Sequence, residues 1–464
     1  MPLRRKKPNK TLRRALLAAL LCAACLINAA PAFAACGAET SCIVRYKDGA
    51  AREEDDGLPF DVVSEAEALR LDRAGLLEWY EPDGELELLE ETASPYYAED
   101  KWDLALIRAD EAFKRGYLGG GVRVGVVDSG VNPHKDLADR LLVGRNYEQE
   151  EATDDTADHY GHGTLVAGLI AGSGENGFLG VAPKAEIVPL KVTDGKAVTV
   201  SAVCRAIYGA VNDFDCRILN LSLGMTAEYK TLEEAVAYAE EQGVLVVSAV
   251  GNNGNSGLFY PAAYDTVVGV GAVGEDGKVY GHSNHNESVF LTAPGAGVKT
   301  AGSHGGYVTG SGTSFAVPHV TAAAAVLLGI DDTLTPADIR QLLSETAADL
   351  GATGWDEYYG YGLLDLSACV VALAGEIEEF DMPCAFLPDS TLRNYTDADI
   401  DLTYLLTEYD ENGKCLSVEL MLLTVPAKDS VTLPPPDENA FYAQYAWDTA
   451  TMTPLAKARE SLST

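Results

Sequence analysis

The sequence is short of positive charge. Lys and Arg total 34 against 70 Asp and Glu, which gives a formal net charge of −36 at pH 7. Nucleic acids and anionic membranes attract proteins through lysine and arginine, so we expect neither class of partner. A strongly acidic, self-repelling surface suits a protein that works outside the cell.

Long uncharged apolar stretches are also scarce, with one exception at the start of the chain. A cluster of basic residues precedes an uncharged run from Ala15 to Ile27, and an Ala-Phe-Ala tripeptide follows. This order is typical of a secretory signal peptide, so we assign residues 1–35 to one, with cleavage near Ala34 or Ala35. No later stretch is expected to span a membrane.

Cysteines are too few, and odd in number, to form a complete disulfide framework. The cysteines that remain beyond residues 1–35 are Cys36, Cys42, Cys204, Cys216, Cys369, Cys384 and Cys415. An odd count leaves at least one thiol unpaired. Cys36 follows the expected cleavage site and leaves cell-surface attachment through a lipid open. Phe33 stands where lipoprotein signals prefer an aliphatic residue, so we expect free secretion.

Apolar strand runs are what the chain has in quantity. The run VRVGVVD at 122–128 is rich in β-branched residues, as in strands buried on both faces of a parallel sheet. Similar runs recur downstream, separated by helical segments, at 185–192, 216–223, 243–250 and 266–273. We therefore predict an α/β fold over residues 91–375, with a doubly wound, mostly parallel sheet.

Different patterns flank this central region. Residues 36–90 read as a small α+β unit, in which 42–49 form a strand, 64–76 an amphipathic helix and 85–89 a second strand by alternation. Residues 376–464 carry strand runs separated by turns. We therefore predict a C-terminal β-sandwich domain there.

Three polar residues stand where such a sheet gathers ligands. Asp128 ends the first buried strand, and ligands of open α/β sheets bind at the carboxyl ends of strands. His162 lies between two glycines at the start of an apolar helix, which permits a close backbone approach by a substrate. Ser314 opens an alanine-rich helix, whose unpaired N–H groups and dipole favour negative charge nearby. Taken singly, Asp128 also suits a turn and Ser314 an ordinary N-cap.

Together, Asp128, His162 and Ser314 supply the groups that a serine nucleophile needs. Serine attacks, histidine takes its proton, and aspartate orients the imidazole and stabilises its charged form. Asn252, which follows a buried strand, is a candidate donor to the oxyanion, with the Ser314 backbone N–H as its partner. A turn asparagine is the alternative reading of Asn252.

The motifs VVDSGV, GHGTLVAG, GNNG and GTSFAVP resemble, in this order, the active-site motifs of the subtilisin-like serine peptidases. The resemblance covers about residues 94–375. It implies that Asp128, His162 and Ser314 form the catalytic triad and that Asn252 donates to the oxyanion.

Substrate contacts follow from the same resemblance. Ser222, Leu223 and Gly224 match the strand that pairs with an extended substrate backbone. Phe259 precedes a Tyr-Pro-Ala turn and stands at the floor of the primary pocket, where the family often has glycine or serine. A filled pocket favours small or medium apolar residues before the scissile bond. The alternative is that Phe259 packs outward and leaves the pocket open.

The resemblance extends to residues 36–90, which are similar to the family's propeptide, a folding chaperone and temporary inhibitor. We therefore expect a secreted, monomeric endopeptidase that hydrolyses protein or peptide substrates through an acyl-enzyme, made as a precursor that cleaves itself near Leu89. Catalysis should need no cofactor. Asp136 matches a family calcium ligand, but the loop 172–183 lacks the usual asparagine-rich run, so a structural Ca²⁺ stays open.

Two other functions stay open at this point. One is a processing peptidase dedicated to a single protein substrate. The other is a non-catalytic relative that binds peptides or surfaces, although such a binder has no need of all four of Asp128, His162, Asn252 and Ser314.

Overall fold

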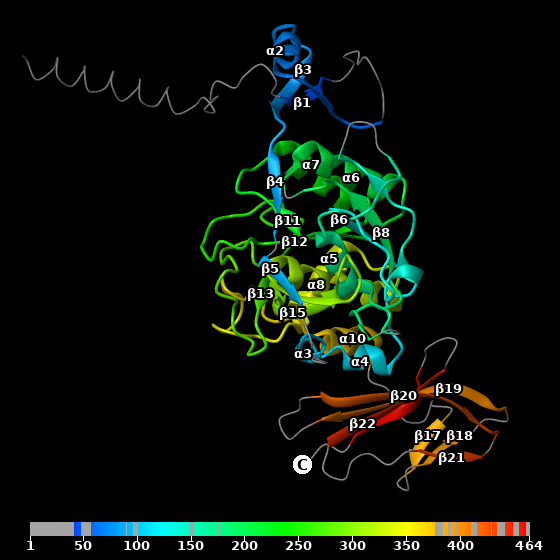
Figure 1. Cartoon of the computed structure of the whole chain (residues 1–464). Helices are drawn as coiled ribbons and strands as arrows, with labels where there is room; N and C mark the ends of the chain where they lie inside the picture. Colours follow the sequence, from blue (N-terminus) through cyan, green and yellow to red (C-terminus); the bar gives the residue numbers. More distant parts are fainter. Residues whose placement is uncertain are drawn as a thin grey trace, which may run out of the picture. The chain divides into compact units, whose positions relative to one another are not determined.

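The fold was analysed in a computed structural model of the chain, which divides into two compact units, Met1–Asp83 and Gly84–Thr464 (Figure 1). The described residues are 41–47, 57–89, 91–95, 101–148, 153–174, 177–195, 197–375, 384–387, 391–394, 398–409, 415–427, 429–433, 441–448 and 454–460. The expected signal peptide at 1–35 lies outside them.

The first unit is a three-stranded antiparallel sheet with one helix. Strand β1 (Ser41–Tyr46) lies between β2 (Asp61–Ser64) and β3 (Leu77–Pro82), and α2 (Glu65–Arg73) packs against the sheet. The Ser64 hydroxyl caps α2 by accepting a hydrogen bond from the Glu67 backbone N–H. The strand and the amphipathic helix expected from the sequence are both present.

The centre of the second unit is a seven-stranded sheet in which every pair of neighbouring strands is parallel. In order across the sheet, the strands are β14 (Leu291–Pro294), β13 (Val268–Val273), β12 (Leu245–Ala249), β10 (Ile218–Leu221), β6 (Arg123–Asp128), β8 (Glu186–Lys191) and β7 (Arg145–Asn146). The predicted α/β fold with a parallel sheet is thus confirmed, and the five apolar runs account for all but its two edge strands.

Helices cover both faces of this sheet, which explains why its inner strands are apolar throughout. In Figure 1, α6 (Val200–Asn212) and α7 (Lys230–Glu241) lie together on one side, and α5 (His162–Ala171) and α8 (Thr313–Ile330) lie on the other. By length and composition α8 could cross a membrane, but 89% of it is buried inside the protein, and no second such helix occurs among the described residues. It is the central core helix.

Shorter elements complete the catalytic region. They are α3 (Trp102–Leu106), α4 (Asp110–Lys114), the 3₁₀ helix η1 (Ala138–Arg140), α9 (Pro336–Thr346) and α10 (Leu366–Ala374). Helices α9 and α10 pack together, and α10 contacts α8. Helix α10, which follows α8 in the sequence, therefore packs against the core helix α8.

Two small antiparallel sheets carry segments from the start of the second unit. Strand β4 (Glu85–Leu88) lies between β11 (Leu223–Gly224) and β9 (Ala197–Thr199). In the other sheet, β16 (Tyr307–Ser311) lies between β15 (Ala296–Ala301) and β5 (Glu91–Pro95). The alternation at 85–89 correctly predicted a strand, but its pairing partners lie in the second unit and not in the N-terminal one, because alternation says nothing about partners.

The C-terminal residues form two antiparallel sheets. One has the order β17 (Cys384–Leu387), β18 (Thr391–Asn394), β21 (Ser430–Thr432), and the other β20 (Cys415–Val425), β19 (Ile400–Tyr409), β22 (Phe441–Asp448), β23 (Pro454–Glu460). Leu392 and Val431 of the first sheet share an apolar cluster with Leu402, Tyr404 and Leu406 of the second. This shared core supports the predicted β-sandwich, which stays a prediction.

Candidate active site

Asp128 and His162 are brought together at the edge where β6 ends. Asp128 is the last residue of β6, His162 is the first residue of α5, and both side chains are buried. The two carboxylate oxygens of Asp128 lie 2.8 and 2.9 Å from His162 Nδ1. A carboxylate acceptor requires the proton on Nδ1, which leaves Nε2 as the ring atom that can take up a proton.

The glycines beside His162 have a structural reason that differs from the predicted one. Gly161 caps α5 with φ 104°, a left-handed conformation that favours glycine. A Cβ on Gly163 would lie 2.1 Å from the Gly130 carbonyl oxygen and 3.1 Å from the Asp128 Cβ. Gly163 therefore allows the start of α5 to pack on β6, which is what brings His162 to Asp128.

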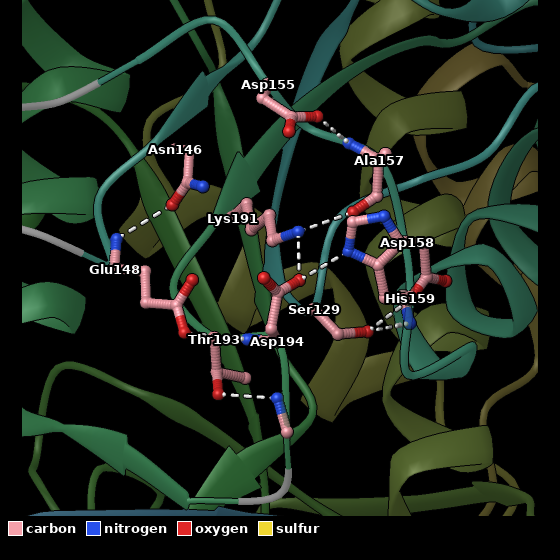
Figure 2. A network of polar contacts seen from close by, with 12 residues as sticks. Ser129, Asn146, Glu148, Asp155, Ala157, Asp158, His159, Lys191, Thr193 and Asp194 are labelled. Atoms are coloured by element: carbon pink, nitrogen blue, oxygen red, sulfur yellow. Dashed lines mark hydrogen bonds and ion pairs between the residues drawn. The ribbon is translucent and has the colours of Figure 1, made fainter.

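A second buried carboxylate, Asp158, holds the segment that carries His162. Its Oδ1 accepts a hydrogen bond from Ser129 Oγ at 2.8 Å (Figure 2). The same oxygen accepts from the Gly161 N–H at 2.6 Å. Its Oδ2 accepts from the N–H and the hydroxyl of Thr164, at 2.9 and 2.5 Å. Burial raises the pKa of Asp158, and these donors oppose that rise. Sequence reasoning missed Asp158, although a carboxylate four residues before His162 suits the capping of α5.

Lys191 connects the same segment to the loop that leads to β9. The side chain is buried at the end of β8, and its Nζ donates to the Ala157 carbonyl at 2.5 Å and pairs with Asp194. Asp194 also lies 2.9 Å from His159 Nδ1 (Figure 2). The hydrogen bond from Lys191 lowers the pKa of Asp194, which keeps this link ionised. The loop that leads to β9 is thereby tied to the residues before His162.

Ser314 is the second residue of α8 and is buried. Pro318 is the sixth residue of this helix. Without an N–H on Pro318, the Ser314 carbonyl has no helical partner, and the Ser222 hydroxyl donates to it instead at 3.0 Å. The proline thus fixes Ser314 against the segment that follows β10.

Asn252 and Ser314 meet at one carbonyl oxygen, that of Leu89. The Asn252 amide oxygen accepts from the N–H and hydroxyl of Thr313 at 2.8 and 2.9 Å, which fixes the orientation of the amide. Asn252 Nδ2 then donates to the Leu89 oxygen at 3.2 Å, and Ser314 Oγ donates to the same atom. The Leu89 N–H donates to the Ser222 carbonyl at 3.2 Å. The carbonyl and the N–H of Leu89 are therefore both hydrogen-bonded.

The residues before Leu89 lie in extended form between β9 and β11. Leu88 and Glu87 are opposite Leu223 and Gly224, and Leu86 is opposite Val198 on β9. Leu86 and Leu88 are buried, whereas Glu85 and Glu87 are exposed. The predicted strand Ser222, Leu223 and Gly224 thus pairs with an extended backbone supplied by the chain itself.

Phe259 lies inward and not outward. It is 5% exposed and belongs to the same apolar cluster as Leu89. A Cβ on Gly224 would come within 2.6 Å of two carbons of the Phe259 ring, and one on Gly251 within 3.1 Å. The ring therefore rests on two glycines whose segments flank Leu89.

Asp136 is the one residue that the resemblance matches to a family calcium ligand. It is buried, and its Oδ2 accepts a hydrogen bond from the Tyr307 hydroxyl at 2.6 Å. Burial, together with this carboxylate, raises the pKa of Tyr307. Among the described residues, no three His, Cys, Asp or Glu side chains cluster as metal ligands. A phenol therefore occupies one oxygen of the Asp136 carboxylate.

A parallel α/β sheet that carries a buried histidine–carboxylate pair, together with a serine and an amide donor on one peptide carbonyl, is typical of a serine-type endopeptidase. The comparisons with known proteins agree with this class. The family model "Peptidase_S8: Subtilase family" matches residues 119–362, and the chain belongs to the subtilase family. Subtilases need no cofactor for catalysis, and membership in an enzyme family removes the reading as a non-catalytic binder.

Three relatives illustrate the similarity. The Thermostable alkaline protease of Halalkalibacterium halodurans is 34% identical over 329 residues, which cover 69% of this chain and 89% of the relative. Subtilisin BL of Lederbergia lenta is 37% identical over 270 residues, 58% of this chain and 97% of the relative. The Minor extracellular protease Epr of Bacillus subtilis is 38% identical over 274 residues, 58% of this chain and 41% of the relative. The chain thus spans less than half of Epr.

Proposed function

We propose that this chain is the precursor of a secreted endopeptidase that cuts its own peptide bond between Leu89 and Glu90. The single observation that carries the proposal is the Leu89 carbonyl oxygen, which accepts hydrogen bonds from Ser314 Oγ and Asn252 Nδ2. A nucleophile and an oxyanion donor on the same carbonyl are what acyl transfer requires.

Each site residue has a separate role in this reaction. Ser314 Oγ attacks the Leu89 carbonyl carbon while His162 Nε2 takes the hydroxyl proton, and Asp128 stabilises the imidazolium through Nδ1. Asn252 donates to the oxyanion that forms. His162 then returns the proton to the departing amine of Glu90, which leaves an acyl-enzyme on Ser314. Water, activated by the same histidine, hydrolyses the acyl-enzyme and frees the Leu89 carboxylate.

The cut segment explains temporary inhibition. Strand β4 pairs with β11 and β9 and buries Leu86 and Leu88, and none of these contacts depends on the bond after Leu89. Residues 36–89 therefore stay bound as an inhibitory propeptide after cleavage, until they are removed or degraded. The same register describes how protein and peptide substrates bind the freed groove, as a strand added between β9 and β11.

Secretion rests on two supports of different kinds. The pattern at 1–35 is that of a signal peptide, and one relative is named an extracellular protease. Whether the enzyme digests proteins broadly or processes one protein is decided by profiling a peptide library.

The test of the proposal is the Ser314→Ala chain expressed alone beside the wild type. We expect the variant to remain at full length after the signal is removed, and the wild type to separate into two fragments. The processed wild type should react with a fluorophosphonate probe at Ser314. Normal maturation of the variant, or a wild type that resists the probe, overturns the proposal.

A further inference from the structure

Gly84, the residue before β4, is enclosed by an aromatic side chain. A Cβ built on Gly84 would lie 2.2 Å from the Tyr229 hydroxyl oxygen and 2.4 Å from the ring carbon that bears it. The Gly84 carbonyl accepts a hydrogen bond from the Val200 N–H at 2.8 Å. The glycine is thus fixed by its carbonyl on one side and covered by a ring on the other.

The backbone of Tyr229 is hydrogen-bonded to a second tyrosine. Tyr229 precedes α7, its N–H donates to the Tyr264 hydroxyl at 3.1 Å, and its carbonyl accepts from that hydroxyl at 2.7 Å. Tyr264 is buried, so this double contact is protected from water. Any residue larger than glycine at position 84 has to displace the ring or leave the Val200 N–H.

Steric enclosure, and not backbone conformation, is the reason for glycine here. Gly84 is absent from the glycines with positive φ, so its backbone is one that alanine can adopt. The side chains of Glu85 and Glu87 on β4 are exposed, so side-chain volume is not restricted at these two positions. The restriction at Gly84 is therefore a matter of side-chain volume alone.

We propose that Tyr229 and the Val200 N–H form an outer subsite that selects glycine at the sixth residue before the scissile bond. The inference rests on the proposed function, which makes Leu89 the first residue before that bond. Together with the buried Leu86, Leu88 and Leu89, it defines the substrate class as extended peptides of the pattern Gly-x-Leu-x-Leu-Leu, with the x positions facing solvent.

A double-mutant cycle in the full-length chain tests the subsite. The rate of self-cleavage after refolding is measured for the wild type, Gly84→Ala, Tyr229→Ala and the double variant. We expect Gly84→Ala to slow cleavage at least about tenfold, the magnitude of a one-carbon misfit. In the Tyr229→Ala background the same change at Gly84 should cost little, so the double variant should cleave at about the rate of Tyr229→Ala. Glu85→Ala, which changes an exposed side chain on the same strand, is the matched control.

Two outcomes overturn the subsite: Gly84→Ala cleaving at the wild-type rate, or Gly84→Ala slowing cleavage as much in the Tyr229→Ala background as in the wild type. Folding of each variant is checked by its thermal unfolding, and Tyr229→Phe, which removes only the nearest atom, should give partial recovery of cleavage when it is combined with Gly84→Ala. Failure of the proposed function looks different, because the wild type itself then never cuts. In that event, the same comparison is made in trans with peptides that carry Gly or Ala before Glu-Leu-Glu-Leu-Leu-Glu-Glu, and equal cleavage of both overturns the subsite.

Discussion

Replacing Phe259 by glycine should change which residue the enzyme accepts before the scissile bond. The ring is buried against Gly224 and Gly251, and we predict that it closes the end of the pocket that receives the residue before the scissile bond. We expect a side chain longer than leucine to meet the ring. Because one methylene too many or too few is worth about 1–3 kcal/mol, we expect the wild type to prefer Leu over Phe at least about tenfold in kcat/KM.

The assay compares two quenched peptides, Gly-Glu-Leu-Glu-Leu-Leu-Glu-Glu and the same sequence with Phe as the sixth residue. In Phe259→Gly the preference should reverse in favour of Phe. Loss of a buried ring costs about 3–5 kcal/mol of folding free energy, so the variant will be less stable. The ratio of two substrates on one enzyme cancels any loss of folded protein, and Phe290→Ala, in the same core, controls for destabilisation. A wild type that cleaves both peptides equally, with no change in Phe259→Gly, refutes the filled pocket.

Three further predictions concern the supporting residues. Asp158→Asn should lower kcat about tenfold and leave KM unchanged, because Asp158 holds the segment that carries His162. A variant with the wild-type kcat would contradict this positioning role. Burial raises the pKa of Tyr147 to about 12, so the neutral phenol stabilises the fold below the ordinary pKa of about 10, and this contribution is lost as pH rises through 12. Thermal unfolding of Tyr147→Phe between pH 9 and 12 should therefore fall less steeply than in the wild type, with the exposed Tyr358→Phe as a control and parallel curves as the contrary result. EDTA should leave the Tm unchanged, because a phenol already satisfies Asp136, and a clear drop in Tm would place a Ca²⁺ site in this protein after all.

The strand runs were predictable because both faces of the parallel sheet are covered, and burial on two sides leaves a continuous apolar pattern. Strands β7 and β14 lie at the edges of the sheet, where this pattern weakens. The strand at 85–89 shows the limit of local patterns. Its alternation predicts which side chains are buried, but its partners, Leu223 and Val198, lie more than a hundred residues further along the chain.

The residues of the candidate site were likewise predictable only in part. Asp128, His162, Asn252 and Ser314 were predicted from short motifs. The structure pairs Asp128 with His162 and brings Asn252 and Ser314 to the Leu89 carbonyl, and the roles of all four stay proposals. Asp158 was missed although its position before α5 suits capping, and Tyr229 was missed because its contact with Gly84 joins segments far apart in the sequence. The contact between Ser222 and the carbonyl left open by Pro318 was likewise invisible, since it requires knowing that two segments 92 residues apart are neighbours.

The most direct test of the account is the intact mass of the fragments that the refolded wild-type chain produces. We predict one cut, between Leu89 and Glu90, with the N-terminal fragment still bound to the enzyme until denaturant is added. A mature enzyme whose first residue lies elsewhere, with Leu89 and Glu90 still joined, would contradict the claim that the Leu89 carbonyl is held for attack by Ser314.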